Sequence, residues 1–167
     1  DNRPLQYSEF WLKTQQCLLV SATPGTTELN MIQEDKAPPV EMVIRPTYVP
    51  DPVIDVRPTH GQLEDLKVEI QRRAQSSQRT LALVLTKRDA EGFLRSTTAL
   101  LQMVGRAARN IHGSAIFYAN RVTDSMKTTM DITARRRQLQ LDHNARYNKQ
   151  MRSTQGTSML SIFDLAK

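Results

Sequence analysis

Three side chains that can bind phosphate recur at helical spacing in the second half of the chain. Gln102, Arg106 and Arg109 lie within residues 92–110, which have the apolar periodicity of a helix ended by a glycine at position 113. At 100° per residue these side chains fall on one face. The residues on the opposite face are apolar: Phe93, Leu100, Val104, Ala107 and Ile111. Because guanidinium groups form forked hydrogen bonds with phosphate oxygens, the spacing predicts a helix whose polar face can hold an anion.

Spacing alone leaves two interpretations of this helix open. It is either an ordinary amphipathic helix with a solvated basic face, or one whose basic face receives a ligand. Gly105 costs a helix about 1 kcal/mol relative to Ala, which favours a positional role for it. With Gly105, Ala107 and Ala108, the segment is thin enough for a ligand or another backbone to approach. Arg95 lies on the polar side and can contact phosphate or DNA, or form a surface salt bridge.

Patterns on either side of this helix predict the sheet that positions it. Residues 80–86 and 114–119 are apolar without alternation, as is typical of parallel strands covered on both faces. Shorter apolar runs at residues 17–20 and 41–45 predict two further strands. Residues 46–58 carry four prolines, which a helix does not tolerate and only extended or edge chain accepts.

Two more helices complete the predicted α/β layer fold. Residues 61–78 have apolar side chains at helical spacing, and residues 123–147 follow Thr123 and Asp124, which can cap a helix. The order of strand, helix and strand is typical of a parallel sheet with flanking helices. We expect the chain to become loose from Ser153 onward.

Composition excludes several classes of protein. The chain has 167 residues, 39% of them apolar, and no run approaches the ~18 apolar residues of a membrane span. The single cysteine, Cys17, excludes an intramolecular disulfide, and we expect a buried thiol in a reducing compartment. His60, His112 and His143 lie far apart in the sequence, so we expect no metal site.

The net charge of +6 is unevenly distributed. Residues 1–85 hold 9 Lys or Arg against 11 Asp or Glu, whereas residues 86–167 hold 14 against 6. Such asymmetry suggests a polyanionic partner for the second half. Arg135, Arg136 and Arg137 are candidates for contacts with DNA phosphates, and a solvated helix face is the alternative interpretation.

The string Gln102-Met103-Val104-Gly105-Arg106-Ala107-Ala108-Arg109-Asn110 resembles motif VI of superfamily-2 helicases. More narrowly, the chain resembles the B-subunit (UvrB) family of the bacterial UvrABC excinuclease, which verifies damage in nucleotide excision repair. Supporting strings occur in family order over residues 1–148. They are Asp1-Asn2-Arg3-Pro4-Leu5, Val20-Ser21-Ala22-Thr23-Pro24-Gly25, Ile44-Arg45-Pro46-Thr47, Asp51-Pro52, Val56-Arg57-Pro58-Thr59-His60-Gly61-Gln62-Leu63-Glu64-Asp65-Leu66, Leu85-Thr86-Lys87-Arg88, Glu91-Gly92-Phe93-Leu94-Arg95-Ser96 and Ser125-Met126.

The resemblance implies an incomplete RecA-like second motor lobe of the P-loop NTPase type. Residues 1–35 would be the end of the first lobe, residues 36–148 the truncated second lobe, and residues 149–167 a flexible tail. Ser21, Ala22 and Thr23 would be motif III, which couples nucleotide state to DNA; a simple strand-ending turn is the alternative.

The resemblance also implies the roles of the site residues. Arg106 and Arg109 would be phosphate-sensing arginines that stabilise the γ-phosphoryl of ATP, with Gln102 and Gly105 beside them. The intact family protein uses ATP and Mg²⁺ and acts with DNA and with subunits A and C of the excinuclease. It is cytoplasmic in bacteria, or resides in an organelle of bacterial origin.

The chain departs from the family in ways that limit its chemistry. Its six glycines never form Gly-x-x-x-x-Gly-Lys-Ser/Thr, and there is no Asp-Glu box. We therefore expect the chain to bind ATP and Mg²⁺ weakly and not to hydrolyse ATP alone. After Arg88 the family continues through the middle of the second lobe, whereas here Asp89 follows directly, which indicates an internal deletion. Three functions stay open: a motor subunit, a basic binding module, or a non-functional remnant.

Overall fold

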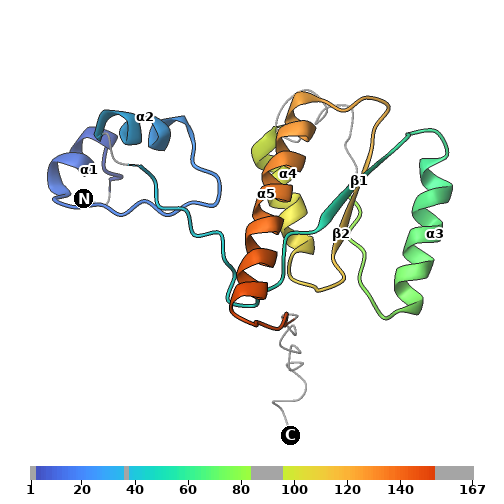
Figure 1. The fold of residues 1–167 in the computed structure, drawn as a ribbon. Helices are drawn as coiled ribbons and strands as arrows, with labels where there is room; N and C mark the ends of the chain where they lie inside the picture. Colours follow the sequence, from blue (N-terminus) through green and yellow to red (C-terminus); the bar gives the residue numbers. More distant parts are fainter. Residues whose placement is uncertain (1–2, 36–37, 84–95, 153–167) are drawn as a thin grey trace, which may run out of the picture. The chain divides into compact units, whose positions relative to one another are not determined.

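The computed structural model describes residues 3–35, 38–83 and 96–152. The elements, in chain order, are α1 (Tyr7–Lys13), α2 (Thr26–Asp35), β1 (Val53–Arg57), α3 (Gln62–Gln75), α4 (Thr97–Ala107), β2 (Ser114–Tyr118) and α5 (Asp124–Arg146) (Figure 1). They divide into two compact units: the N-terminal unit, Asp1–Glu41, and the C-terminal unit, Met42–Lys167. None of the helices in the described ranges is long and apolar enough to cross a membrane.

Short-range contacts hold the N-terminal unit together. The backbone N–H of Gln6 donates to Glu9 Oε2 at 2.9 Å, which satisfies a free donor at the start of α1. The Trp11 ring meets the Phe10 ring edge-on, with 5.2 Å between centroids. None of the described residues 3–34 is buried. This unit therefore has no apolar core among the residues that the structure describes.

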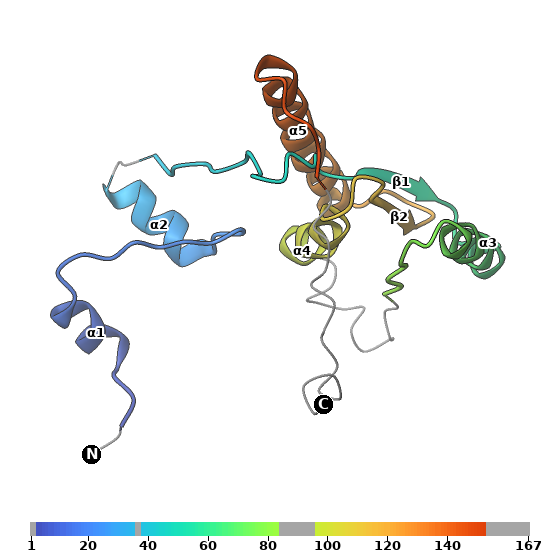
Figure 2. The same ribbon diagram turned by 90° about the horizontal axis from the view of Figure 1, so that it is seen from below.

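The C-terminal unit is built on a parallel pair of strands. β1 pairs with β2 from Val53 opposite Ser114 to Arg57 opposite Tyr118. Helices α4 and α5 lie on one side of this pair and α3 on the other, as both views show (Figures 1 and 2). The prediction of a parallel α/β arrangement with flanking helices is confirmed.

The core of this unit contains many polar residues. Its buried apolar residues are Val49, Pro50, Pro52, Ala99, Val104, Ala108 and Met126. Its buried polar residues are Asp51, Thr129, Thr133, Gln140 and Asn144. Burying a polar group costs free energy unless it forms a hydrogen bond, so the partners of these side chains decide how the unit is held together.

Three predicted helices are present, with changed ends. The helix predicted over residues 61–78 is α3 (Gln62–Gln75), which begins after Gly61 in a left-handed conformation at φ 71°. The helix predicted over residues 123–147 is α5 (Asp124–Arg146), and Thr123 Oγ1 accepts from the Met126 N–H at 3.3 Å as an N-cap. The helix expected over residues 92–110 is α4, which ends at Ala107; residues 92–95 lie outside the described ranges.

Three predicted strands are wrong in their described parts. Residues 17–20, 41–45 and 80–83 are irregular, and residues 84–86 lie outside the described ranges. β2 pairs with β1 and not with the segment after α3. Leu18 and Leu81, which were expected to be buried, are 88% and 62% exposed. A strand needs a neighbour for its backbone N–H and C=O groups, and these runs have none among the described residues.

The expectation of a buried cysteine is also wrong. Cys17 is exposed, in the same irregular run. An apolar run reports a tendency to be buried, whereas burial itself needs packing partners from elsewhere in the fold. The N-terminal unit does not supply them in the described residues.

Candidate phosphate-binding site

The turn after α4 sets the direction of Arg109. Ala108 caps the helix, and the Gly113 N–H donates to the Asn110 carbonyl at 2.9 Å. A Cβ at Gly113 would lie 2.0 Å from the Ala107 carbonyl oxygen, so this turn requires glycine. The turn therefore determines the direction of the Arg109 side chain, whereas the sequence predicted that Arg109 lies on the polar face of the helix itself.

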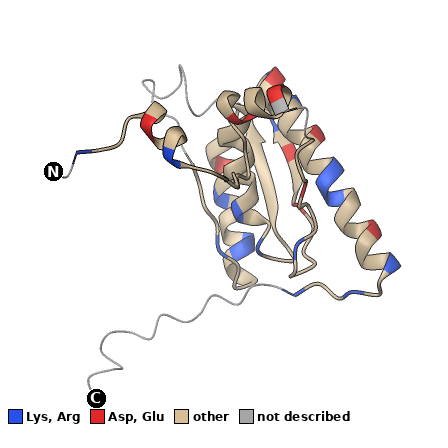
Figure 3. Cartoon of the chain, turned by 90° about the vertical axis from the view of Figure 1, so that its left-hand side faces the viewer, with Lys and Arg blue, Asp and Glu red and all other residues tan. Residues whose placement is uncertain are grey.

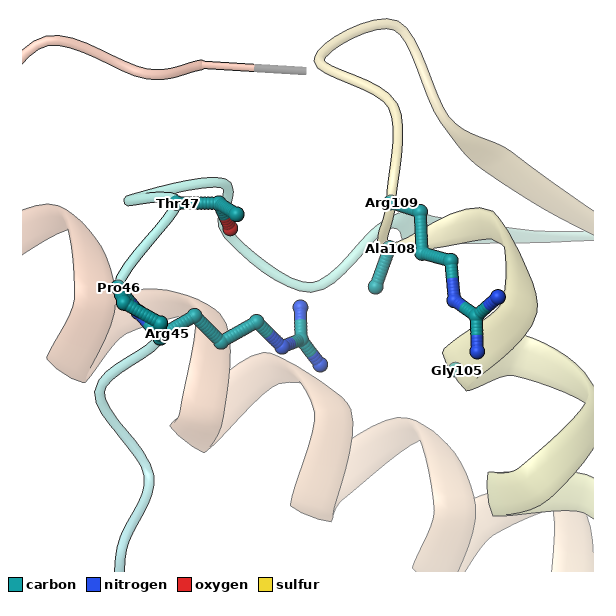
Figure 4. Close-up of a pocket in the computed structure, with 6 residues that line it drawn as sticks. All are labelled: Arg45, Pro46, Thr47, Gly105, Ala108 and Arg109. Atoms are coloured by element: carbon teal, nitrogen blue, oxygen red, sulfur yellow. The ribbon is translucent and has the colours of Figure 1, made fainter. Parts of the chain in front are cut away.

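A hollow of about 370 Å³ opens beside this turn in the C-terminal unit. Its lining residues come from the end of α4 and from the segment before β1: Arg45, Pro46, Thr47, Gly105, Ala108 and Arg109. Arg45 extends from the segment before β1, and the Arg109 side chain runs past Gly105 at the end of α4 (Figure 4). A Cβ at Gly105 would meet no atom within 4 Å, so the missing side chain leaves open space here.

Arg45 is fixed by its own loop. One guanidinium nitrogen donates to the Val49 carbonyl at 3.3 Å, and the other pairs with the Asp51 carboxylate. Asp51 is buried, and a buried carboxylate needs such a partner. Because a guanidinium carries five N–H groups, these two bonds leave donors for a ligand in the hollow.

Side chains of helix α5 form hydrogen bonds with residues 45–51, which we call the 45–51 loop. The Arg45 N–H donates to Gln140 Oε1 at 2.7 Å, and Asn144 Nδ2 donates to the Tyr48 carbonyl at 2.7 Å. Gln140 Nε2 joins the two amides by donating to Asn144 Oδ1 at 2.9 Å. The polar core residues of α5 are therefore the attachment points of this loop.

Further contacts hold the same loop. Arg137 donates to the Asp51 carbonyl at 2.8 Å. The Tyr48 ring, in a left-handed backbone conformation at φ 60°, stacks on His143 with an angle of 12° between planes. The Arg152 N–H donates to the Thr47 carbonyl at 2.9 Å. The loop is thus fixed along most of its length.

The structure brings only part of the predicted site together. Gly105 and Arg109 line the hollow. Gln102 and Arg106 are exposed on α4 and are not among the lining residues. Arg95 lies outside the described ranges.

The other predicted site residues lie elsewhere. Ser21, Ala22 and Thr23 form a bend in the N-terminal unit, where Ser21 Oγ accepts from the Thr23 N–H at 3.1 Å. Arg135 is exposed and Arg136 partly exposed on α5, whereas Arg137 contacts the 45–51 loop. Acidic and basic residues are interspersed along α5, and both kinds occur on the helices (Figure 3).

On the other side of the sheet, ionic groups attach α3. Arg57 on β1 reaches Asp65 at 2.7 Å and Glu69 at 3.1 Å, both on α3. Tyr118 on β2 donates its hydroxyl to Asp65 at 2.5 Å. α3 itself has no buried residue, so this cluster supplies much of its attachment.

These contacts shift the protonation of the cluster. The Tyr118 hydroxyl and the Arg57 guanidinium lower the pKa of Asp65 below its usual value. Arg72, followed by Arg57, lowers the pKa of Glu69. Burial, with the hydrogen bond to Asp65, raises the pKa of Tyr118 to about 12. The cluster therefore favours charged carboxylates and a protonated tyrosine at neutral pH.

Sequence reasoning missed Arg45, Gln140 and Asn144 as site residues. Arg45 stood in a string with Pro46 and Thr47 that already carried the family resemblance. Gln140 and Asn144 are spaced i, i+4 on α5, which puts two amides on one face of a helix. That spacing was the available signal. No group of three or more potential metal ligands (His, Cys, Asp or Glu) occurs among the residues that the structure describes.

Known proteins resemble this chain over most of its length. A family model described as Ultra-violet resistance protein B (UvrB) matches residues 117–155. UvrABC system protein B of Synechococcus elongatus is 37% identical over 214 residues, covering 89% of this chain and 32% of the relative. The same-named proteins of Gloeothece citriformis and Thermosipho africanus are 34% and 33% identical, covering 100% and 88% of this chain and 35% and 32% of the relatives.

The lengths of these matches bear on the predicted deletion. The match to the Gloeothece citriformis protein extends over 236 residues, whereas this chain has 167, so about 70 positions in it have no counterpart here. The predicted junction, Arg88 to Asp89, lies outside the described ranges. The chain spans about a third of the length of the curated relatives it matches. By this sequence similarity, and with a parallel α/β arrangement that agrees with it, the chain belongs to the UvrB family.

Proposed function

We propose that this chain contributes the arginine half of an ATP site to a UvrB-type, helicase-related subunit of a nucleotide-excision-repair excinuclease. The observation that carries the proposal is the hollow lined by Arg45 on the segment before β1 and by Arg109 after α4, beside the bare backbone of Gly105. In this proposal residues 1–35 end the first motor lobe, residues 36–148 are a shortened second lobe, and residues 149–167 are a tail.

The chemistry of the hollow suits a chain of phosphates. Two guanidinium groups, together with the Thr47 hydroxyl, offer N–H and O–H donors to non-bridging oxygens. Arg109 would stabilise the charge that develops on the transferring phosphoryl group, and Arg106 would add a second charge from the exposed face of α4. We assign no Mg²⁺ ligand, since the described residues hold no cluster suited to a metal.

The remaining parts of the proposal rest on family membership. DNA and subunits A and C of the excinuclease would be the partners, in the bacterial cytoplasm. The phosphate-cradling loop is not in this sequence, so we expect the chain alone to bind a triphosphate weakly and not to cleave it.

The test is a titration of the full chain with ATP in which the arginine side-chain N–H signals are monitored by NMR. We expect ATP to shift the signals of Arg109 and Arg45, and Arg109→Gln to weaken binding about tenfold, as loss of one charge-assisted hydrogen bond would. Arg121→Gln is the matched control, because Arg121 is exposed and outside the hollow. Equal weakening in both variants, or measurable single-turnover cleavage of ATP by the chain, would contradict the proposal.

A second candidate function is a basic DNA-binding module on α5. The observation that favours it is that Arg135 is exposed and Arg136 partly exposed there. Affinity for a DNA duplex should then fall steeply with salt, and Arg135→Gln with Arg136→Gln should lower both the affinity and the salt slope. Affinity that is insensitive to salt and to both changes would exclude this candidate.

A further inference from the structure

We infer that Gln140 and Asn144 are positioning residues of the hollow, which fix Thr47 and Arg45 opposite Arg109 through a directional hydrogen-bond relay. The inference rests on the proposed function of the hollow as a phosphate site. It adds two residues that touch no ligand themselves and act through the 45–51 loop.

The ends of the relay fix its direction. It starts at the Arg45 N–H, which can only donate, and ends at the Tyr48 carbonyl, which can only accept. Between them, Gln140 must accept with its oxygen and donate with its nitrogen, and Asn144 must do the same. Each amide therefore has a single orientation that satisfies every bond.

The relay spans the two ends of one tight turn. The Tyr48 N–H donates to the Arg45 carbonyl at 3.0 Å and closes that turn. The two residues between these ends, Pro46 and Thr47, line the hollow. Pinning Arg45 and Tyr48 to α5 therefore sets where Thr47 and the Arg45 side chain stand.

Burial makes the relay specific. Gln140 is 2% exposed and Asn144 8%, so water is not available to replace a lost partner. A carboxylate at either position lacks the N–H donor that the next group requires. Gln140→Glu sets an oxygen against Asn144 Oδ1, and Asn144→Asp sets one against the Tyr48 carbonyl. Either change should release one end of the turn.

The first measurement is hydrogen exchange in the full chain. We expect the Tyr48 N–H, which closes the turn, to be protected in the wild type and to lose at least tenfold of its protection in Gln140→Glu. The carboxylate still accepts from the Arg45 N–H, but it turns the Asn144 amide away from the Tyr48 carbonyl. The Ala119 N–H, bonded to the Arg57 carbonyl at 2.8 Å across the sheet, reports whether the fold persists. The matched control is Gln138→Glu. Gln138 lies on the same helix, is exposed, and donates its side-chain hydrogen bond to Asp142, which is also exposed. Unchanged Tyr48 protection in Gln140→Glu would overturn the relay.

The second measurement is the affinity of the same variants for inorganic tripolyphosphate. We expect about tenfold weaker binding in Gln140→Glu and Asn144→Asp, and wild-type binding in Gln138→Glu. Acidification should rescue Gln140→Glu, because a protonated carboxyl group donates and accepts as the amide does. The wild type and Gln138→Glu, measured at each pH, correct for titration of the ligand and of Asp51 and His143 beside the loop.

The outcomes separate the two claims. If the wild type binds no tripolyphosphate, the proposed function fails, and hydrogen exchange alone decides the relay. If Gln140→Glu loses Tyr48 protection but binds tripolyphosphate like the wild type, the relay has no positioning role and the inference is wrong. If Gln140→Glu also loses Ala119 protection, the fold is disturbed and Asn144→Asp is the deciding variant. If Ala119 stays protected in Asn144→Asp, wild-type affinity for tripolyphosphate overturns the inference. Weaker binding that is restored at acidic pH supports it. If both variants lose Ala119 protection at neutral pH, Gln140→Glu is measured at acidic pH, where its carboxyl group is protonated. Recovery of both Ala119 protection and tripolyphosphate binding supports the inference. Recovery of Ala119 protection without binding overturns it.

Discussion

The two sides of the β1–β2 sheet are attached to their helices by opposite kinds of polar contact. On the α5 side, neutral amides of Gln140 and Asn144 hold the 45–51 loop in a buried setting. On the α3 side, Arg57 and Asp65 form an ion pair with 27% and 41% of their side chains exposed. A buried amide relay depends on direction and is insensitive to salt, whereas an exposed ion pair is non-directional and screened.

This difference suggests that the two sides have different roles, one in positioning the hollow and the other in stabilising the fold. The α5 side fixes the turn that carries Thr47 into the hollow, so its geometry must be unique. The α3 side only holds a helix with no buried residue against the sheet. We therefore expect changes on the α5 side to affect ligand binding and stability together, and changes on the α3 side to affect stability alone.

The largest effect should come from Asn144→Leu, which keeps the number and branching of side-chain heavy atoms and removes both hydrogen bonds. Gln140 Nε2 and the Tyr48 carbonyl would be left buried without partners, at a cost of about 3 kcal/mol in the free energy of unfolding. Urea denaturation should show the same loss at low and high salt. Gln138→Leu, at an exposed position on the same helix, should cost less than about 0.5 kcal/mol. A strongly salt-dependent loss in Asn144→Leu would remove the contrast between the two sides.

Arg57→Met should have the next largest effect. It leaves Asp55, Asp65 and Glu69 without their shared cation, so stability should fall at low salt. The difference from the wild type should shrink as salt is raised to about 1 M, where the screening length falls to about 3 Å. Tripolyphosphate affinity should not change. An affinity loss as large as that of Asn144→Asp would show that the two sides are not independent.

The pH dependence of Arg57→Met follows from the same contacts. The pKa values of Asp65 and Glu69 are lowered in the folded chain, so their contribution to stability is present above the ordinary carboxyl range. It is lost as pH falls below about 4, through the folded-state pKa values. Thermal melts of the wild type and Arg57→Met should therefore converge on acidification. Divergence at low pH would contradict the assignment of these contacts.

Tyr118→Phe should have a smaller effect, near the net value of one hydrogen bond at about 1 kcal/mol. The hydroxyl that it removes donates to Asp65 at neutral pH. Because folding raises the pKa of Tyr118 to about 12, its contribution is present below pH ~10 and is lost as pH rises toward that value. The difference between variant and wild type in urea denaturation should therefore shrink as pH rises from ~10 to about 12. A constant difference at every pH would mean that Tyr118 stabilises by packing only.

The smallest effect on stability, and of opposite sign, should come from Gly105→Ala. A methyl group there meets no atom within 4 Å, and alanine favours a helix by about 1 kcal/mol, so the variant should melt higher. The same methyl group projects beside the hollow, so tripolyphosphate should bind more weakly. If affinity is unchanged while stability rises, Gly105 has no role in ligand access.

The elements of the fold were predictable where the chain supplies its own signal. α3 has apolar side chains at helical spacing, α5 begins at the Thr123 cap, and β2 is a continuous apolar run. The runs at residues 17–20, 41–45 and 80–83 carry an equally strong apolar signal and are not strands. Strand formation depends on a neighbour that can be far away in sequence, and no local pattern reports whether that neighbour exists.

The residues of the candidate site also fall into those that the sequence could predict and those that it could not. Arg109 and Gly105 could be named from the motif, because their spacing is local. The partners of Arg45 could not, because Gln140 lies 95 residues further along the chain. Polar residues on α5 look like a solvated face in the sequence, and only the tertiary contact turns them into a buried relay.

The most direct test of the central claim is a double-mutant cycle for tripolyphosphate affinity, built from Gln140→Glu and Arg109→Lys. If the relay acts by holding the 45–51 loop opposite Arg109, both changes weaken the same bound state. The account predicts that the double variant loses clearly less affinity than the product of the two single losses. Losses that multiply independently, with Ala119 still protected in every variant, would contradict it.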